Sequence, residues 1–390
     1  MLVLRRLIAV FVALFCVTGS SITSSADAQA LESSMVVGSS RVELTFNDPL
    51  AAGGVDWAHL DKFVRLIKDA PNTATIRIGI HYLAQAWVAN EIIAAKNRGV
   101  TVNVVLDGKH TRQGAETTLI GALGALLRVC GSASTGGGCI SSDSGGYMHA
   151  KYMLLSQTKD SAGTLRSNVV WVSSANLTQP SGAQQFNSSV TVYGDGTLYS
   201  GYLSHVWNPM WARNRNYPNN DYYVASMPRG YFGSTTSNST VFVSPEQNTD
   251  QILGRLNNID PDSNCRIRVM HASFSDGRSA VADKLVSLKA GGCKIWIMVG
   301  NSSDAMSPSN LTKFKNAGIS VHKGKIHDKM ILVSEGANNA HTWVLFGSQN
   351  LTEASLRKQD NLLMRLEDNQ AMYDAFYAHF NRAYNNYPAA

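Results

Sequence analysis

The chain has 390 residues, of which 44% are hydrophobic and 16% are charged, a composition that excludes a largely disordered protein. This length accommodates two ordinary domains or one large duplicated unit. The formal net charge of +6 falls to +5 (6 − 2 + 1) when Arg5, Arg6 and Asp27 leave with the leader described next. This mild positive charge suits any anionic substrate, and the lack of a Lys/Arg run argues against a strong nucleic-acid binder.

The first 30 residues have the layout of a secretory signal peptide. Two arginines precede an apolar run over residues 7–17, and Ala28-Gln29-Ala30 marks an expected cleavage site after Ala30. The apolar run is too short for a good membrane span, and no later stretch reaches its length. We therefore expect residues 1–30 to be removed and the mature chain to be secreted (extracellular or periplasmic) and soluble.

The first half shows a strand, a helix and a second strand in that order. Residues 75–80 and 100–106 are rich in Ile and Val and predict strands, and residues 87–97 predict an amphipathic helix that Gly99 ends. This order is a βαβ unit, which favours parallel strands covered by helices. We expect the N-terminal half to extend over residues 31–233.

The second half repeats the same order. Residues 266–270 and 294–299 predict strands, and residues 279–290 predict a helix. The internal repeat predicts an α/β protein in which each half has a mainly parallel, doubly covered sheet. We place the junction in the Ser/Thr-rich residues 234–240 and the C-terminal half over residues 241–390.

An aromatic stretch lies before the junction, over residues 207–232, and includes Trp211, Tyr222 and Tyr223. Two interpretations are open. The stretch could contact lipid, because Trp and Tyr favour membrane interfaces. A packed connection between the halves is favoured, since aromatic side chains bury large apolar areas.

Four cysteines remain after the leader: Cys130, Cys139, Cys265 and Cys293. An even number in an exported protein favours two disulfides, although three connectivities are open. We expect Cys130–Cys139 to close a Gly/Ser-rich loop and Cys265–Cys293 to join neighbouring strands. A zinc site is the alternative, but the spacings do not match CxxC pairs and no His cluster accompanies them.

One set of polar residue types occurs twice, in the same order and at similar spacing. In each copy His-x-Lys precedes Ser-x-Asn-Leu-Thr, with 27 and 23 residues from His to Asn. Either pattern alone is common in strands and turns, but the duplication favours a functional site. The two sets are His149, Lys151, Ser174 and Asn176 in the first half, and His327, Lys329, Ser348 and Asn350 in the second.

Strand geometry predicts where these side chains point. Residues two apart in a strand face the same side, so each His should project together with its Lys, and each Ser with its Asn. A pseudo-twofold axis would bring the two sets face to face in one site. Asn187 and Asn361 follow at matching places and are expected either to steady the histidines or merely to begin a strand.

Such a site suits a phosphate diester. Lysine, asparagine and serine side chains donate to non-bridging phosphoryl oxygens and stabilise the charge of the transition state. One neutral imidazole can attack phosphorus to give a phosphohistidine, while the other, protonated, gives its proton to the leaving oxygen. This scheme needs no metal ion or other cofactor, and it predicts a bell-shaped pH profile.

These motifs resemble those of the phospholipase D superfamily, whose signature is His-x-Lys-x4-Asp followed by a Gly/Ser-x-Asn stretch, twice in two-domain members. The resemblance spans nearly all of the mature chain. It implies a duplicated αβα sandwich, with two similar halves related by a pseudo-twofold axis and the active site between them. It also implies a metal-independent phosphodiesterase or phosphatidyltransferase. By position, we assign His149 as the nucleophile and His327 as the acid/base.

The chain departs from that signature at Ser156 and Ser334, which stand where the family has Asp. A residue seven positions after the His faces the opposite side of a regular strand. We therefore expect these serines to form supporting hydrogen bonds rather than to touch the phosphate.

The leading hypothesis is a secreted, monomeric phospholipase D that acts on glycerophospholipids at a membrane or micelle surface, by hydrolysis or by transfer to an alcohol. A nuclease acting on nucleic acid is the first alternative. It shares the phosphodiester chemistry, but no aromatic and basic stacking platform is visible near the motifs. A non-catalytic module that binds phosphate headgroups is the second.

Overall fold

The computed structural model describes residues 31–109, 114–224 and 229–390, apart from the side chains of Leu31 and Asn339. The expected signal peptide, residues 1–30, lies outside this part. Within it, no helix is both long and apolar enough to cross a membrane.

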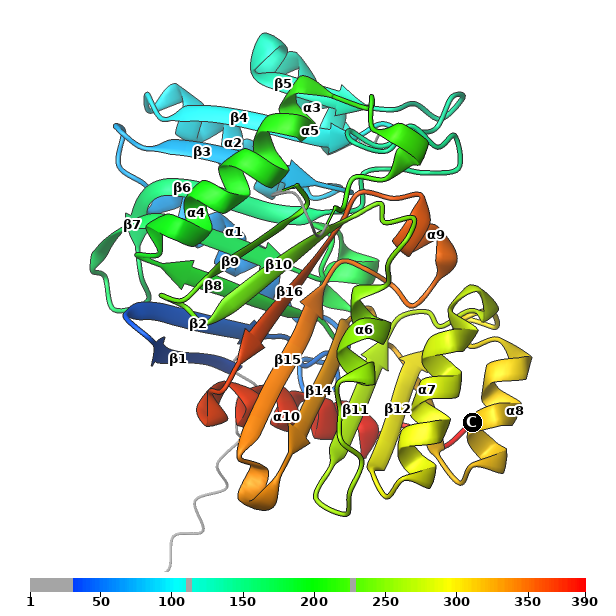
Figure 1. The fold of residues 1–390 in the computed structure, drawn as a ribbon. Coiled ribbons are helices and arrows are strands. Elements are labelled where there is room, and N and C mark those ends of the chain that lie inside the picture. Colours follow the sequence, from blue (N-terminus) through cyan, green and yellow to red (C-terminus); the bar gives the residue numbers. More distant parts are fainter. Residues whose placement is uncertain (1–30, 110–113, 225–228) are drawn as a thin grey trace, which may run out of the picture.

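Two eight-stranded sheets form the centre of the protein (Figure 1). The first sheet contains, in spatial order, β1 (Leu31–Val37), β2 (Ser40–Phe46), β8 (Ser188–Tyr193), β7 (Leu165–Ser173), β6 (Lys151–Lys159), β3 (Thr75–Ile80), β4 (Thr101–Asp107) and β5 (Leu127–Cys130). The second contains β13 (Ser320–Gly324), β12 (Lys294–Gly300), β11 (Arg266–His271), β14 (Lys329–Glu335), β15 (His341–Gly347), β16 (Asn361–Glu367), β10 (Ser239–Ser244) and β9 (Tyr231–Ser234).

The two sheets repeat one topology, which confirms the predicted duplicated α/β fold. Strands β3, β4 and β5 pair in parallel, as do their counterparts β11, β12 and β13, whereas all other neighbouring strands in both sheets are antiparallel. The expectation of a mainly parallel sheet is therefore wrong. The βαβ units supply only these parallel strands. Hairpins such as β6–β7, and longer returns such as the one from β3 to β6, add antiparallel neighbours.

Helices cover the outer faces of both sheets. The first sheet carries α1 (Ala58–Lys68), α2 (Ala86–Asn97) and α3 (Gly114–Leu123), and the second carries α6 (Gln251–Asn257), α7 (Ser279–Ala290) and α8 (Pro308–Asn316). Helix α2 buries Val88, Ile92 and Ala95 against the sheet, which is the apolar face that its sequence predicts. The strand, helix and strand predicted in each half are thereby confirmed.

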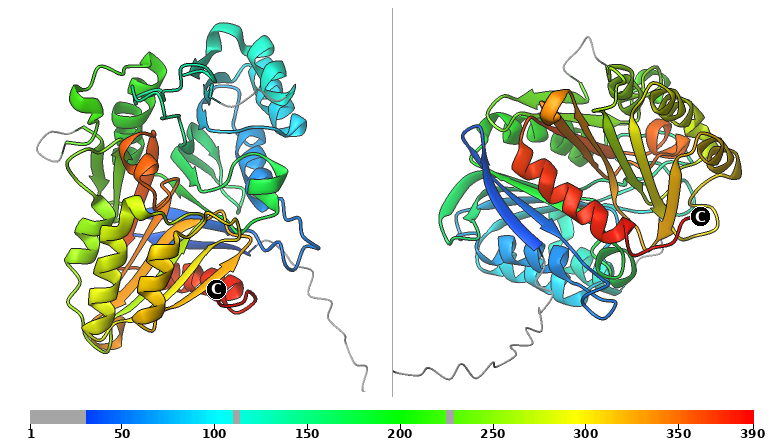
Figure 2. Two further views of the ribbon diagram at one scale, coloured as in Figure 1. Left: turned by 90° about the vertical axis from the view of Figure 1, so that its right-hand side faces the viewer. Right: turned by 90° about the horizontal axis from the view of Figure 1, so that it is seen from below.

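The remaining helices lie between or beside the sheets. They are α4 (Gly196–Tyr202), α5 (Asn208–Ala212), α9 (Glu353–Arg357) and α10 (Gln370–Tyr384). Helix α10 packs on β14 and β15 of the second sheet and also touches β1 and β2 of the first, as the right view of Figure 2 shows. Short helical segments occur at η1 (Gly124–Leu126), η2 (Gln179–Ala183), η4 (Pro218–Asn220), η5 (Asp276–Arg278) and η6 (Ala337–Asn339), and η3 (Leu203–Trp207) joins α4 to α5 without a break.

A shared hydrophobic core joins the halves. Tyr152 and Phe186 from the first half and Leu332 and Phe346 from the second belong to one buried cluster, while each outer helix layer has a cluster of its own. The hairpin β9–β10 pairs with β16, so these two strands belong to the second sheet. The expected junction, residues 234–240, covers the hairpin turn at 235–238 and the strand ends beside it.

The aromatic stretch packs into this shared core. Trp207 and Tyr222 are buried in it, and Trp211 and Tyr217 pack against it. Tyr231 is 38% exposed. The favoured interpretation of a packed connection between the halves is therefore confirmed.

Both expected disulfides are present. Cys130–Cys139 closes the loop that follows β5, and Cys265–Cys293 joins the residues that precede β11 and β12. The second bridge thus connects two strands that lie side by side in parallel.

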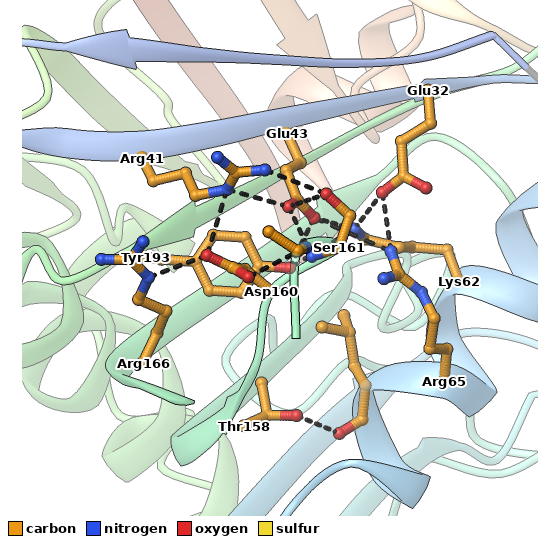
Figure 3. A network of polar contacts seen from close by, with 12 residues as sticks. Glu32, Arg41, Glu43, Lys62, Arg65, Thr158, Asp160, Ser161, Arg166 and Tyr193 are labelled. Carbon is orange, nitrogen blue, oxygen red and sulfur yellow. Dashed lines mark hydrogen bonds and ion pairs between the residues drawn. The ribbon is translucent and has the colours of Figure 1, made fainter. Parts of the chain in front are cut away.

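A buried ion cluster fixes β2 against α1 and β8 (Figure 3). The carboxylate of Glu43 is fully buried and pairs with Lys62, and it accepts hydrogen bonds from the Tyr193 hydroxyl at 2.7 Å and the Ser161 amide at 2.8 Å. Burial alone would raise the pKa of Glu43, but the charge of Lys62 and the hydrogen bonds from Lys62 and Ser161 hold it far below its usual range.

We expect Glu43→Gln to lower the free energy of unfolding by on the order of 3 kcal/mol, because the buried Lys62 ammonium loses its fully buried partner and keeps only the ion pair with the partly exposed Glu32. Urea unfolding at pH 7 measures this loss, and Lys313→Ala in the exposed Lys313–Asp283 pair serves as a control with little effect. Since the folded pKa of Glu43 lies below the unfolded value of 4.5, its contribution is present above that pH and declines as the pH falls further. An equal loss for both variants would contradict this account.

Candidate active site

Each motif histidine lies just before a strand, not within one. Strand β6 begins at Lys151 and β14 at Lys329, so His149 and His327 occupy the bends that lead into them. The Nζ of Lys151 donates to the carbonyl oxygen of His149 at 2.5 Å, and Lys329 makes the same bond to His327. The expectation that each motif lies within a strand is therefore wrong for the histidines, because strand pairing begins only at the lysine, two residues later.

The two histidines are held by asparagines from the opposite half. His149 Nδ1 lies 2.8 Å from Oδ1 of Asn361, and His327 Nδ1 lies 3.0 Å from Oδ1 of Asn187. Backbone bonds follow the same crossed pattern: the His149 amide donates to the Asp360 carbonyl at 2.9 Å, and the His327 amide donates to the carbonyl preceding Asn187 at 3.0 Å. Each half therefore completes the histidine site of the other.

The asparagine amides determine the histidine tautomers. The Nδ2 of Asn187 donates to the Ser181 and Gln185 carbonyl oxygens, and the Nδ2 of Asn361 donates to the Ser355 carbonyl oxygen. Each Oδ1 is therefore the end that faces the imidazole, and an amide oxygen can only accept. Nδ1 must carry the proton in both rings, which leaves Nε2 with a free lone pair when the ring is neutral.

The motif serines support these asparagines. The hydroxyls of Ser174 and Ser348 each donate to the Oδ1 of Asn187 and Asn361, respectively, at 3.0 Å. Each hydroxyl also accepts a hydrogen bond from a backbone amide of the adjacent strand. Their hydroxyls are thus used to orient the asparagines, whereas the sequence suggested contact with phosphate.

The motif asparagines keep one amide end open. Asn176 donates from Nδ2 to the Ser181 hydroxyl at 3.0 Å. The Oδ1 atoms of Asn176 and Asn350 are buried and find no hydrogen-bond partner within the described residues. Since buried polar atoms are almost always paired, these two acceptor atoms are open to a donor group of a ligand.

Ser156 and Ser334 lie near the far ends of β6 and β14, five residues after the lysines. The Ser156 hydroxyl accepts a hydrogen bond from the Thr75 amide at 2.9 Å, which holds the start of β3. Ser334 is buried and its hydroxyl has no partner among the described residues. Neither serine contacts the motif histidines.

Four basic groups, the motif histidines and lysines, lie close enough to influence one another's charge. Lys151 and Lys329 are fully buried, and burial is the main cause that lowers the pKa of both, to about 7 for Lys329. The charge of Lys329 depresses the pKa of Lys151 further. Burial and the charges of both lysines hold the pKa of His149 and that of His327 well below the usual range. Burial and mutual repulsion therefore favour the neutral forms of these groups until an anion enters.

The surroundings of the two histidines differ. His149 is buried, with its ring 4.8 Å from the His81 ring and 5.5 Å from the Tyr147 ring, measured between centroids. His327 is partly exposed. Beside it, the buried carboxylate of Asp328 accepts a hydrogen bond from the Ser188 hydroxyl at 2.8 Å and lies 3.1 Å from Nε2 of a histidine in α10.

Sequence reasoning missed Asp328 and Asp360. Asp328 stands between the motif His and Lys, but Ala150 stands at that place in the first copy, so the repeat gave no signal. The Asp360 carboxylate is buried and accepts hydrogen bonds from the amides of residues 139–141 in the disulfide loop, at 2.5 to 3.0 Å. Burial raises the pKa of Asp360 to about 6, against the effect of these amides. Its place directly before Asn361 is the signal that could have found it.

A polar cavity of about 460 Å³ opens beside the site. It is bordered by Tyr147 and Asn350 on the side of the histidines, and by the exposed carboxylates of Asp304 and Glu353 farther out. Hydroxyl and amide groups complete its wall, from Ser273, Ser275, Thr352, Ser355 and Gln359. No cluster of three His, Cys, Asp or Glu side chains suited to a metal ion occurs in the described residues.

A duplicated α/β fold with two His-Lys sets meeting between its halves is the arrangement of the phospholipase D superfamily. The family model described as "Cardiolipin synthase, PLD-like domain" matches residues 63–207 and 261–384, more than half of the chain. The chain belongs to this family, whose members process phosphodiesters. No curated protein sequence matches the chain.

Two of the similar solved structures, with TM-scores above 0.5, share the fold at low sequence identity. Phosphatidylserine synthase from Haemophilus influenzae superposes with a TM-score of 0.56 and 11% identity, over 89% of this chain and 87% of that one. Polyphosphate kinase from Porphyromonas gingivalis superposes with a TM-score of 0.55 and 12% identity, over 87% of this chain and 50% of the kinase. This chain therefore spans half the kinase's length. Nuc, a phospholipase D family member from Salmonella typhimurium, is 22% identical over 39% of this chain and 97% of its own, with a TM-score of 0.33.

We expect Asn361→Ala to lower kcat on a phosphodiester by roughly 10- to 100-fold, because the His149 ring loses the bond that fixes its tautomer and direction. Exposed Asn72→Ala is the matched control and should leave kcat unchanged. Asn361→Asp gives a sharper readout: a carboxylate next to Nδ1 favours the imidazolium, so the acid limb of the pH profile should move to higher pH. An unmoved limb would indicate that Asn361 has only a packing role.

Proposed function

We propose that this protein is a secreted, monomeric phospholipase D that hydrolyses glycerophospholipids through a phosphohistidine intermediate. The observation that carries this proposal is the crossed pair of histidines, each with Nδ1 fixed by an asparagine and each next to a buried lysine. The predicted leader over residues 1–30 and the two disulfides support export.

In the first step, Nε2 of His149 attacks phosphorus and the bond to the leaving alcohol oxygen breaks. Protonated His327 donates its proton to that oxygen, so the alcohol leaves neutral. The ammonium groups of Lys151 and Lys329 balance the charge of the non-bridging oxygens. We infer that the Asn176 and Asn350 amides, whose Oδ1 ends are unpaired in the free protein, turn on binding so that Nδ2 donates to the same oxygens.

In the second step, His327, now neutral, takes a proton from water while the water oxygen attacks phosphorus. The bond between phosphorus and His149 Nε2 breaks, which releases phosphatidic acid and restores both histidines. An alcohol in place of water would give a transfer product by the same path.

The histidine surroundings support these roles. In the free protein the pKa values of both histidines lie well below the usual range, so both rings are neutral at neutral pH. An entering phosphate anion favours the protonated form of the ring that faces the leaving group. His327 is the more exposed ring and can exchange protons with water. His149 is buried, and burial favours the neutral ring that a nucleophile requires.

The cavity beside the site favours a phospholipid over a nucleic acid. Its outer wall carries Asp304 and Glu353, whose charges would repel the neighbouring phosphates of a polynucleotide but would not hinder a small headgroup alcohol. The alternative of a non-catalytic headgroup-binding module is disfavoured because both His–Asn pairs and both lysines are retained.

We expect the mature protein to cleave phosphatidylcholine or phosphatidylethanolamine, but not DNA, in the presence of a chelator. His149→Ala and His327→Ala should each lower the rate by about 10²- to 10⁴-fold or more. A p-nitrophenyl diester separates the two roles, because its leaving group needs no acid. His327→Ala should then release a burst of nitrophenol and stall, whereas His149→Ala should show no burst. Cleavage of DNA alone, or loss of all cleavage with chelator, would overturn the proposal.

The pH dependence has a specific origin in Lys329. Since its pKa is about 7 in the free protein, it loses its charge as the pH rises above that value, and kcat/KM should fall through weaker binding of the anion. The acid limb should lie below pH 6.5, the ordinary histidine value, because the pKa of His149 is lowered. Lys329→Arg should move the alkaline limb upward, since a guanidinium stays charged. The exposed Lys294→Arg is the control, and an unmoved limb in Lys329→Arg would assign it to another group.

A further inference from the structure

A second basic cavity lies at the opposite end of the second sheet. It has a volume of about 180 Å³ and is formed between β11, β14 and α10. Ser334 in its wall lies five residues along β14 from Lys329, which corresponds to roughly 17 Å. The cavity is therefore separate from the catalytic histidines. Its full lining is Arg266, Arg268, Ser334, Gln370, Tyr373, Asp374 and Tyr377.

Arg268 is held rigidly in this cavity. Its side chain is buried, and its guanidinium lies between two aromatic rings, 4.6 Å from the Trp296 centroid and 4.1 Å from the Tyr377 centroid. It donates one hydrogen bond to the Tyr373 hydroxyl at 2.8 Å. It forms no ion pair with a carboxylate in the described part of the chain. A buried cation without a counter-ion is costly, so this geometry favours a bound anion.

Two further groups suit the same anion. The hydroxyl of Ser334 is buried, lines the cavity and has no hydrogen-bond partner among the described residues. Arg266 lies directly across the strand pair from Ser334 and bonds only to a backbone carbonyl, that of Asn264 at 2.6 Å. Asp374, an exposed carboxylate of the rim, is hydrogen-bonded by Gln370 at 2.7 Å and forms no ion pair with either arginine.

The first half shows what is special about this cavity. In the first half, Arg77 donates a hydrogen bond to the Tyr199 hydroxyl at 3.3 Å, just as Arg268 donates to Tyr373. The arginine–tyrosine pair is therefore present in both halves. However, the Ser156 hydroxyl, which corresponds to that of Ser334, already accepts a hydrogen bond from the Thr75 amide. In addition, the first half has Thr75 at the position that Arg266 occupies in the second. Two arginines and an unpaired hydroxyl therefore occur together in the second half.

The missing aspartate leaves Asp374, on the exposed rim, as the only carboxylate in the lining of this cavity. Ser334 stands at the position where the family signature has Asp, and an Asp side chain there would face the guanidinium groups. Serine is smaller and uncharged, so space and positive charge remain together. We propose that this cavity is a binding site for a phosphate group, held by both arginines and the Ser334 hydroxyl. Arginine suits this ligand because its planar fork matches phosphate oxygens.

Calorimetric titration of the mature protein with inorganic phosphate tests the proposal. We expect a binding event, distinct from the one at the catalytic lysines, that Arg266→Gln weakens about tenfold or more. Lys294→Gln is the matched control, since Lys294 is the exposed cross-strand neighbour of Arg266, lies outside the cavity lining and carries the same charge. Ser334→Asp should abolish this event while it preserves the melting temperature and the competitive inhibition of catalysis by phosphate.

Vesicles identify the source of the phosphate group. Phosphatidic acid in phosphatidylcholine vesicles offers a phosphate monoester, and phosphatidylglycerol at equal charge is the control. Binding of free phosphate that depends on Arg266 supports the site with a soluble ligand. Binding only of phosphatidic acid vesicles, again dependent on Arg266, supports it with a lipid ligand. If wild-type, Arg266→Gln and Ser334→Asp proteins behave alike in both assays, the cavity is not a phosphate site.

Discussion

The crossed hydrogen bonds between the motif histidines and the asparagines of the opposite half are the interaction on which the site depends. An imidazole can act as a nucleophile or as an acid only if the right nitrogen faces the substrate, and the amide oxygens of Asn187 and Asn361 determine that nitrogen. Because each asparagine belongs to the other half, the chemistry requires the two halves to dock in one register. The shared core between the sheets provides that register.

Burial of two lysines in one site is unfavourable in the free protein, and the lowered pKa values of Lys151 and Lys329 express this cost. The cost is recovered when an anion enters, because the same low-dielectric surroundings strengthen its attraction to both ammonium groups. The asymmetry between the buried His149 and the partly exposed His327 then gives two chemically similar residues different tasks. A nearly symmetric fold can thus support a reaction whose two steps differ.

The repeat made the fold and the principal residues predictable, because strands, helices and polar motifs recur at matching places in one chain. The partners of Asn187 and Asn361 were not predictable, since their contacts cross between segments far apart in the sequence. Ser174 and Ser348 were assigned to phosphate because their pattern shows residue type but not the direction of a hydroxyl. The parallel sheet was overestimated because a βαβ unit reveals nothing of the antiparallel strands added beside it.

The disulfide loop makes the two halves non-interchangeable. Three consecutive backbone amides of that loop, those of residues 139–141, donate hydrogen bonds to the carboxylate of Asp360, which precedes Asn361. In the first half, the residue that precedes the corresponding Asn187 is Phe186. A symmetric dimer of two first halves would therefore leave these amides facing a phenyl ring, at a cost of about 1–3 kcal/mol for each buried unpaired donor. Although the chain looks like one unit used twice, its two halves are chemically distinct at this contact, and neither half can replace the other.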